Sequence, residues 1–394
     1  MSRLQELMRE LCPDGVEYKA LGDVCNIRTG LKPKSIAETG LFAYINAGTS
    51  NSGYVAESNT IGDTVTTPSR GQGGIGFIGY QSDDFWCGPL CYRVRARNGN
   101  LLNRFVYHAM WFCRPQILSF VNEGGTPALN RRDLQTLRIP VPPIEVQREV
   151  VRILDEYTAA HDELVRQLEQ EMRLREQQLS IARNELLTFS ERERVRWMAL
   201  ADVATFGGGH TPSKAVAANY EDDGIWWVTS KDVKTDVLTS TGITISELGA
   251  STLTLYPRGT LVMVTRSGVL KRLLPVAFLD DDMTVNQDIK AIMPDESKVL
   301  SRYLFHVLKK DDTIIREQYG KVGGTVDSVN FNMVKKHKVP VPPIEVQQRA
   351  VEQLDAYVTA HNELAGALTE DLVHCDQQLT LVRNQLLSFP EKVA

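Results

Sequence analysis

The sequence predicts an α+β fold in which two mixed α/β domains, related by pseudo-twofold symmetry, are joined by two long helices that form an antiparallel coiled coil. Three observations predict it: an internal repeat, a helical apolar pattern within each copy of the repeat, and strand-like segments outside the copies. We divide the chain into residues 1–138 and 190–338 as globular domains, residues 139–189 as the central helix and residues 339–394 as the distal helix.

The repeat is strongest in two proline-led segments. Residues 140–189 align with residues 340–389 without a gap, and 25 of the 50 aligned positions are identical. Fainter matches flank them, such as Arg104-Phe-Val-Tyr-His108 with Arg302-Tyr-Leu-Phe-His306, and a Gly-Gly-Thr stretch ahead of each helix. The chain is therefore a tandem duplication whose globular parts have diverged.

Length and cysteine usage agree with this division. A chain of 394 residues exceeds the roughly 250 to 300 residues at which a single core stops growing. The six cysteines form no CxxC pair and none lies in residues 190–338, so we expect neither a duplicated metal site nor a disulfide framework. No signal peptide and no apolar run of membrane-spanning length is visible, which predicts a cytoplasmic protein without a membrane segment.

The net charge of −5 is unevenly distributed along the chain. Residues 1–138 hold 15 basic and 12 acidic side chains, and residues 190–338 hold 20 and 19. The two predicted helices hold 6 against 10 and 3 against 8. The excess of acidic side chains therefore lies in the predicted helices, and the globular segments carry a small net positive charge. That permits a phosphate-facing surface, although such clusters are more often solvated faces.

Each long helix is expected to begin at a pair of prolines, Pro142-Pro143 and Pro342-Pro343. Proline fixes φ near the helical value, and the glutamate two positions later suits the first turn. Apolar residues then recur at alternating steps of three and four, with one extra step of four, which is the pattern of a coiled-coil seam with one stutter. We expect helix pairing or partner docking at Pro143, Leu154, Tyr157, His161, Leu164, Leu168, Leu179, Leu186, Pro343, Leu354, Tyr357, His361, Leu364, Leu368, Leu379 and Leu386.

An alternative to the coiled coil is an amphipathic helix packed on its own domain. About 45 residues at about 1.5 Å each would outreach one such domain, which favours helix pairing. The matched His161 and His361 could bind metal or sense pH, but a polar residue that fixes the register of the seam is the commoner case, and we assign no chemistry to them.

The globular segments contain strand-like pieces at 76–79, 90–94, 259–265 and 274–279, and helical periodicity at 101–120 and 299–318. Residues 71–76 formally match GxGxxG, but a strand-like piece follows and the second domain has no counterpart, so a nucleotide-binding loop is not expected. No carboxylate pair, Cys-His arrangement or nucleophile elbow recurs in both halves. We expect no catalytic residue and no metal in this chain.

One arginine does recur after a strand-like piece, in Thr67-Pro-Ser-Arg70-Gly71 and in Thr265-Arg266-Ser267-Gly268. A guanidinium beside a small hydroxyl residue and a glycine suits contact with phosphate or a guanine edge, although an ordinary surface turn is equally compatible. With the neighbouring basic clusters, the candidate DNA-binding residues are Arg28, Lys32, Lys34, Ser69, Arg70, Lys214, Arg266, Ser267, Lys271 and Arg272.

Two divergent domains, each closed by a G-G-T…N stretch, a P-V-P-P-I-E-V-Q start and a long helix ending in R-N-x-L-L-x-F, resemble the specificity subunit of type I restriction-modification systems. The resemblance covers essentially the whole chain. It implies a non-catalytic, sequence-specific DNA-binding subunit in which each globular domain reads one half of an asymmetric bipartite target. It also implies that the paired helices set the spacer and dock two modification subunits.

The same resemblance implies double-stranded DNA, two modification (methyltransferase) subunits and restriction (ATP-dependent translocase and nuclease) subunits as partners, and no membrane. S-adenosylmethionine, ATP and Mg²⁺ would be used by the other subunits and none by this chain, in which neither a methyltransferase (D/N)PP(Y/F) motif nor a Walker loop occurs. Two other hypotheses stay open from the residues alone: a coiled-coil scaffold, and a two-module carbohydrate-binding or hydrolase protein.

Overall fold

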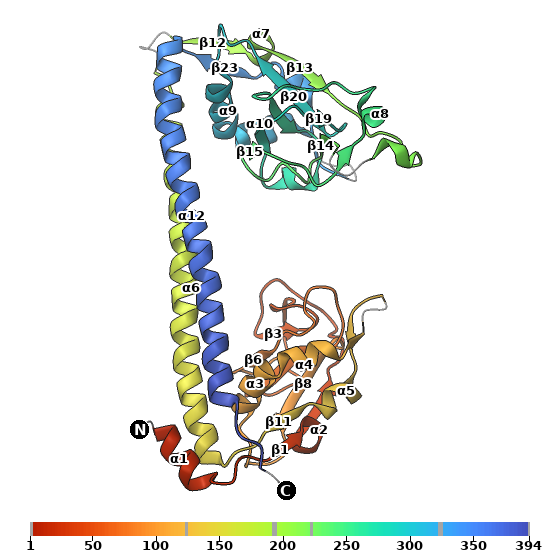
Figure 1. The fold of residues 1–394 in the computed structure, drawn as a ribbon, viewed down its shortest axis with the longest axis vertical. Helices are drawn as coiled ribbons and strands as arrows, with labels where there is room; N and C mark the ends of the chain where they lie inside the picture. The colour runs from red at the N-terminus through yellow and green to blue at the C-terminus, as the bar shows by residue number, and fades with distance from the viewer. Residues whose placement is uncertain (1–2, 123–124, 191–194, 221–223, 322–325, 393–394) are drawn as a thin grey trace. The chain divides into compact units, whose positions relative to one another are not determined.

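A computed structural model describes residues 3–122, 125–190, 195–220, 224–321 and 326–392. The chain forms two compact units (Figure 1). Unit 1 contains residues 1–169 and 369–394, and unit 2 contains residues 170–368. Each unit combines one globular domain with the beginning of one long helix and the end of the other. The Gly-Gly-Thr stretches lie partly (124–126) or wholly (323–325) outside the described residues.

Unit 1 is built on a four-stranded sheet in the order β2-β8-β5-β6 and a three-stranded sheet in the order β4-β3-β7, with two further two-stranded sheets, β1-β11 and the β9-β10 hairpin. Its elements are α1 (Arg3–Leu11), β1 (Tyr18–Ala20), α2 (Leu21–Val24), β2 (Cys25–Thr29), β3 (Phe42–Ile45), β4 (Tyr54–Val55), β5 (Thr64–Pro68), β6 (Gly79–Gln81), β7 (Trp86–Cys87), β8 (Cys91–Ala96), α3 (Asn103–Phe112), α4 (Arg114–Ser119), β9 (Val121–Asn122), β10 (Ala128–Leu129), α5 (Arg131–Thr136) and β11 (Arg138–Pro140). The pair β1-β11 joins the two ends of the globular domain in an antiparallel ladder.

The two faces of the four-stranded sheet differ in chemistry. Val65 and Val94, which are partners across β5 and β8, are fully buried in one core with Phe105 of α3. Their neighbours Thr66 and Arg93 are also partners across these strands and, by the alternation of side chains along a strand, lie on the opposite face. The sheet therefore packs one face on α3 and presents the other as a polar surface.

Unit 2 repeats this plan with a five-stranded sheet, β13-β20-β17-β18-β15, and a three-stranded sheet, β16-β14-β19. Strand β15 runs parallel to β18 and has no equivalent in the four-stranded sheet of unit 1. The elements are β12 (Arg196–Ala199), α7 (Leu200–Val203), β13 (Ala204–Gly208), η2 (Ala217–Asn219), β14 (Ile225–Val228), β15 (Val237–Leu238), β16 (Thr244–Ile245), α8 (Glu247–Ala250), β17 (Leu261–Val264), η3 (Gly268–Lys271), β18 (Val276–Leu279), β19 (Thr284–Val285), β20 (Ile289–Pro294), α9 (Ser301–Lys310), α10 (Asp312–Tyr319), β21 (Gly320–Lys321), β22 (Ser328–Val329), α11 (Phe331–Val334) and β23 (Lys338–Val341).

Most of the expected secondary structure is present. The segments 90–94, 259–265 and 274–279 contain β8, β17 and β18, and each expected domain helix is a pair of helices, α3 with α4 and α9 with α10. The prediction of a strand at 76–79 was wrong for its first three residues: residues 76–78 are turn and coil, and β6 begins only at Gly79. Gly76 has φ of +81°, a left-handed conformation that an extended strand does not allow.

The long helices are α6 (Ile144–Leu187) and α12 (Ile344–Leu387), each of 44 residues and each beginning directly after its proline pair. Within unit 1, Val146 and Val150 of α6 share a core with Leu387 of α12, and further along His161 Nε2 lies 2.9 Å from Asp376 Oδ1. Residue numbers thus rise along one helix as they fall along the other, so the pairing is antiparallel.

Unit 2 shows the same antiparallel pairing. The buried Ala350 and Leu354 at the beginning of α12 share a core with Ala182 and Leu187 at the end of α6. No helix in the described part of the chain combines the length and apolarity needed to cross a membrane.

Five of the positions predicted for helix pairing or docking are exposed: Pro143 and Pro343 at the helix starts, and two tyrosines and a leucine further along. Tyr157 is 52% exposed, Tyr357 54% and Leu164 41%, whereas Val358 is only 6% exposed. Successive residues on a helix are about 100° apart, so positions 157 and 158 flank the direction of Leu154 on opposite sides. Because Asp155 also faces the globular domain, the buried sector runs through 154, 158 and 155. Tyr157 therefore lies at the outer edge of this buried sector.

Candidate nucleic-acid interface

Each globular domain is fixed to its long helix by the same set of polar contacts. In unit 1, Arg104 Nε donates to Asp155 Oδ1 at 2.8 Å, and His108 Nε2 lies 2.8 Å from the same oxygen. In unit 2, Arg302 and His306 hold Asp355 at 2.9 Å. Burial lowers the pKa of His306 to about 4 although Asp355 opposes the shift, and burial also lowers the pKa of His108.

We call each set of contacts between a globular domain and its long helix a joint. A buried glutamine completes each joint. Gln147 is 0% exposed, accepts from the backbone N–H of Leu102 at 2.9 Å, and donates to the carbonyl oxygens of Asn100 and Pro142. Gln347 makes the equivalent three hydrogen bonds in unit 2, to Leu300, Lys298 and Pro342. The glutamine thus joins the start of the long helix to the segment before α3 or α9. The shared Q in the repeated helix start has a structural reason.

The polar face of the unit 1 sheet carries a basic cavity of about 430 Å³, lined by Arg28, Arg93 and Arg95 among others. Arg28 is exposed there. The other two are engaged: Arg93 donates to the Asn59 carbonyl at 2.9 Å, and Arg95 donates to the Asp63 carbonyl at 3.0 Å. Arg28 is therefore the one of these three whose side chain is exposed toward a ligand, and the other two hold the loop before β5.

The first recurring arginine lies where β5 leaves the sheet. Arg70 pairs with Ala128 in an isolated antiparallel bridge, which places the turn beside the β9-β10 hairpin, and its side chain is exposed. The following Gly71 has φ of +137°, so the turn requires glycine there. Ser69 is half-buried, and its N–H donates to the Leu90 carbonyl.

The second arginine follows β17 in the same way but has a partner. Arg266 pairs with Ser328 in an isolated bridge beside β21-β22, and its Nε donates to Asp288 Oδ1 at 2.6 Å. Ser267 caps the short helix η3 by accepting from the N–H of Val269 at 3.5 Å. The matched sequence positions are therefore matched in space within each unit, but only Arg266 is held by a carboxylate.

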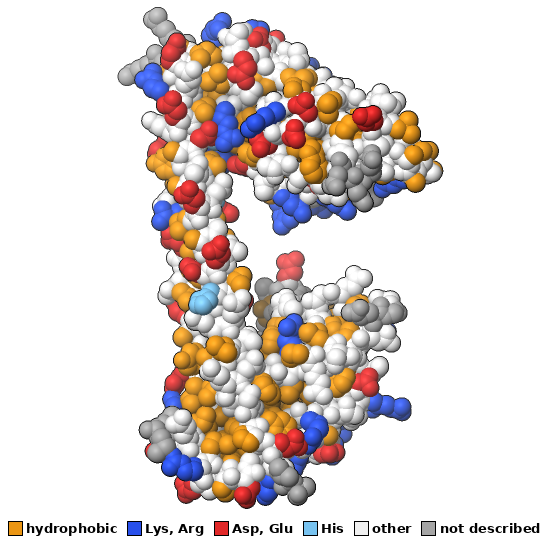
Figure 2. All heavy atoms as spheres, viewed as in Figure 1, with side chains coloured by type: hydrophobic (Ala, Val, Ile, Leu, Met, Phe, Trp, Pro, Cys, Tyr) orange, Lys and Arg blue, Asp and Glu red, His pale blue; other side chains and the backbone are white. Residues whose placement is uncertain are grey.

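The structure does not gather the remaining candidates into one patch. Lys32, Lys34, Lys214 and Arg272 are exposed, the first three in the loops that follow β2 and β13. Lys271 Nζ lies 4.0 Å from Asp327 Oδ2 and is also exposed. Figure 2 agrees: on the face shown, basic side chains are scattered among acidic ones in both units.

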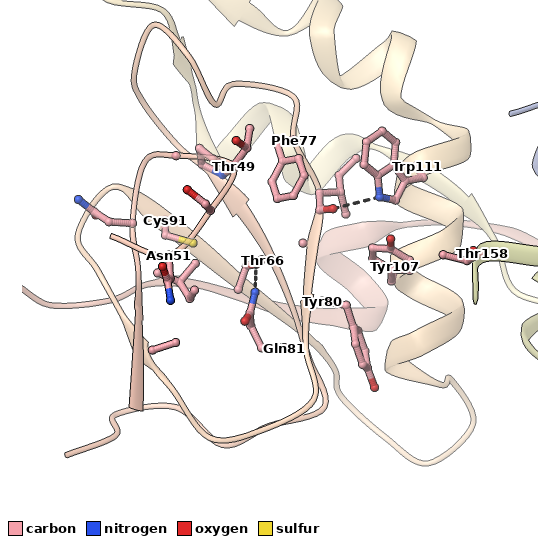
Figure 3. Close-up of a pocket in the computed structure, with 18 of the residues that line it drawn as sticks. Thr49, Asn51, Thr66, Phe77, Tyr80, Gln81, Cys91, Tyr107, Trp111 and Thr158 are labelled. Atoms are coloured by element: carbon pink, nitrogen blue, oxygen red, sulfur yellow. Dashed lines mark hydrogen bonds between the residues drawn. The ribbon is translucent and has the colours of Figure 1, made fainter. Parts of the chain in front are cut away.

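A larger cavity of unit 1 was not predicted from the sequence. It measures about 600 Å³ and lies between the loop 46–51, the edge of β5 and β6, and α3 (Figure 3). Aromatic side chains line one part, and hydroxyl and amide side chains the other. The labelled residues Phe77, Tyr80, Tyr107 and Trp111 belong to the first group and Thr49, Asn51, Thr66 and Gln81 to the second. Such a lining suits stacking together with hydrogen bonding.

Unit 2 has a basic cavity of about 450 Å³ at a different place, beside β13, β20 and the β21-β22 hairpin. Lys290, Lys321 and Lys335 line it, and the Lys335 ammonium lies 5.2 Å from the centre of the Phe206 ring and 5.7 Å from that of Phe331. None of these three lysines is among the candidate DNA-binding residues that the sequence predicts. Three lysines from separate elements could not be assigned to one site before the fold was known.

Among the described residues, no group of three or more His, Cys, Asp and Glu side chains could hold a metal ion. The described surfaces therefore offer cationic, hydroxyl and aromatic groups. Groups of these kinds bind phosphates and base edges.

Comparisons with known proteins agree with these features. The family described as "Type I restriction modification DNA specificity domain" matches residues 13–173 and 193–372. The chain is 34% identical over 263 residues to the specificity subunit of the Escherichia coli type I restriction enzyme EcoR124I/EcoR124II, a match that covers 64% of this chain and 64% of that subunit. It is 28% identical over 385 residues to a putative type I restriction enzyme specificity subunit of Haemophilus influenzae, covering 95% and 96% of the two chains.

A solved structure supports the fold. A chain from work on complex assembly and conformational transition of the type I R-M system has a TM-score of 0.69 and 18% sequence identity, with 96% of this chain and 98% of that chain covered. Because the family match spans both halves, the chain belongs to the type I restriction modification DNA specificity family.

Proposed function

We propose that this chain is a DNA-binding specificity subunit in which each globular domain reads one half of an asymmetric bipartite target. The proposal rests on one contrast: the contacts that fix each domain to its long helix are the same in both units, whereas the basic cavities of the two domains differ. The cavity of unit 1 has Arg28 on the sheet face, and that of unit 2 has three lysines. Identical mounting of two different surfaces is what two different half-sites require.

Recognition would combine phosphate contacts with base readout. Exposed lysines and Arg28 supply charge for the backbone, which positions the protein without selecting sequence. Arg70 and Arg266 have the guanidinium geometry that suits a guanine edge in the major groove. Asp288 would hold the Arg266 fork in one orientation, and this favours a directional contact over a mobile one.

The chain itself would have no catalytic step. In the proposed complex, two modification subunits would methylate adenine with S-adenosylmethionine, and restriction subunits would cleave with ATP and Mg²⁺. The paired helices would set the distance between half-sites and dock the modification subunits. Half-exposed Tyr157, Tyr357 and Leu164 support docking, because large apolar side chains on a helix surface gain by being covered.

The test uses the full chain purified with a modification subunit. We expect duplex binding whose affinity falls steeply with salt, and adenine methylation at one bipartite motif that disappears from host DNA when the gene is deleted. Partner binding without any DNA binding would instead support a pure scaffold. Hydrolysis or carbohydrate binding by the isolated chain would support the third hypothesis.

A further inference from the structure

Arg383, near the end of α12, is a buried cation that forms no ion pair with any residue in the described part of the chain. It is 7% exposed, and its Nε has no hydrogen-bond partner. Its guanidinium carbon lies 5.3 Å from the centre of the Trp111 ring. Burial lowers the pKa of Arg383, as expected for a cation that has lost water without gaining an anion.

The arginine lines a pocket of about 350 Å³ within unit 1, which we call the Arg383 pocket. The guanidinium carbon of Arg114 also lies over the Trp111 ring, 5.5 Å from its centre, and Arg114 Nε donates to the Gly76 carbonyl oxygen at 2.9 Å. The pocket therefore holds two guanidinium groups, and of these only that of Arg114 has a hydrogen-bond partner at Nε. Thr380, Asn384 and Ser388 of the α12 end supply hydroxyl and amide groups, and no acidic side chain lines it. The pocket therefore combines positive charge with hydrogen-bonding groups.

Unit 2 contains the same arginine with an anion already in place. Arg183 of α6 is the repeat partner of Arg383, and its Nη2 lies 3.6 Å from Asp236 Oδ2. Lys309, at the α9 position equivalent to Trp111, lies 2.8 Å from the other oxygen of Asp236. Asp236 directly precedes β15, the strand that the four-stranded sheet of unit 1 lacks. Unit 1 therefore keeps the arginine and lacks the segment that supplies its acid.

We propose that the Arg383 pocket binds a carboxylate side chain, aspartate or glutamate, from a protein partner, as Asp236 binds Arg183 within unit 2. A carboxylate fits the fork of an arginine in two hydrogen bonds, and a buried charge is retained at lower cost when it is paired. The identification of the partner as a modification subunit rests on the proposed function. The carboxylate chemistry of the pocket does not.

The first test uses the full chain alone and acetate as the probe. At equal ionic strength, acetate in place of chloride should raise the melting temperature by about 2 to 4 °C. The rise should be absent in Arg383→Met, which keeps the packing on Trp111 and removes the charge. It should also be absent in Thr380→Glu, which places an acid one turn from Arg383 on the same helix. Thr380→Gln is the matched control and should respond like the natural chain.

The second test measures assembly with the modification subunit. Arg383→Met and Thr380→Glu should each weaken it at least tenfold, while Thr380→Gln and Arg183→Met leave it within about twofold. Arg183 already has its acid within the chain, so its loss should change the stability of unit 2 rather than assembly.

Two results would overturn the proposal. If Arg383→Met lowers the melting temperature but keeps the stabilisation by acetate and assembles as the natural chain does, Arg383 is a packing residue. If instead the variant assembles normally but binds duplex DNA at least tenfold more weakly, the pocket holds a phosphate. Failure of the natural chain to bind a modification subunit would count against the proposed function, and the acetate titration would still decide the chemistry of the pocket.

Discussion

Asp355 on α12 lies 2.9 Å from Nε2 of His306 on α9, and the histidine side chain is completely buried. The same contact joins Asp155 to His108 in unit 1. In both units the second ring nitrogen, Nδ1, has no hydrogen-bond partner. The carboxylate on the long helix thus orients a neutral imidazole of the domain, and the joint depends on the histidine staying neutral.

Stability should therefore fall in mild acid. The pKa of His306 is about 4 in the folded chain against 6.5 for the free side chain. Between these values the unfolded chain binds a proton that the folded chain excludes, so the contribution is complete above about pH 6.5 and is lost as pH falls toward 4. We expect a loss of roughly 2 to 4 kcal/mol across this window, measured by denaturant unfolding.

The matched variants are His306→Gln, which should flatten the pH dependence, and His210→Asn, which removes an exposed histidine. An unchanged slope in His306→Gln would mean that other groups cause the acid sensitivity.

The buried glutamine of each joint should contribute more to the free energy of unfolding than an exposed glutamine does. Gln147→Ala removes three hydrogen bonds, to backbone groups of Leu102, Asn100 and Pro142, of which the bond to Pro142 is buried and the other two are partly buried. We expect a loss of about 2 to 4 kcal/mol in the free energy of unfolding. Gln353→Ala, at an exposed position of α12, should change it by less than about 0.5 kcal/mol. Equal effects of the two substitutions would show that the buried contacts are not needed.

The recurring arginines should differ in how they contribute to DNA binding. Arg70→Ala and Arg266→Ala should each cost about 1 to 3 kcal/mol of binding if the side chain reads a base. Asp288→Asn should weaken binding only where Arg266 is present, because it acts by orienting that arginine. Titration of target duplexes at several salt concentrations measures both effects. An Arg266→Ala complex with unchanged affinity and salt slope would remove this residue from the interface.

The sequence predicted what repeats and missed what depends on three-dimensional neighbours. The helix starts directly after Pro143 and Pro343, and the matched turns at Arg70 and Arg266, could be predicted because both copies keep these residues. Helical spacing alone could not choose between Tyr157 and Thr158 for the seam, since the choice depends on Asp155 facing α3. The Arg-x-x-x-His match before each helix was noticed, but its aspartate partner is about 50 positions away and looks like an ordinary helix charge.

The candidate site was harder to predict from the sequence for the same reason. Arg93 and Arg95 add positive charge to residues 1–138, yet their guanidinium groups donate to carbonyl oxygens of the loop before β5. Conversely, Lys290, Lys321 and Lys335 come from three separate elements and meet only after folding. Charge can be counted along a chain, but its engagement by neighbouring backbone groups cannot.

The central claim is that two different reading surfaces are mounted on identical joints. Its most direct test replaces residues 1–138 with the matching domain of a relative that keeps arginine and histidine at the positions of Arg104 and His108, and then maps methylated adenines in host DNA. We expect one half of the bipartite motif to change while the other half stays the same. A change in both halves, or an unaltered motif from a complex that assembles normally, would contradict the account.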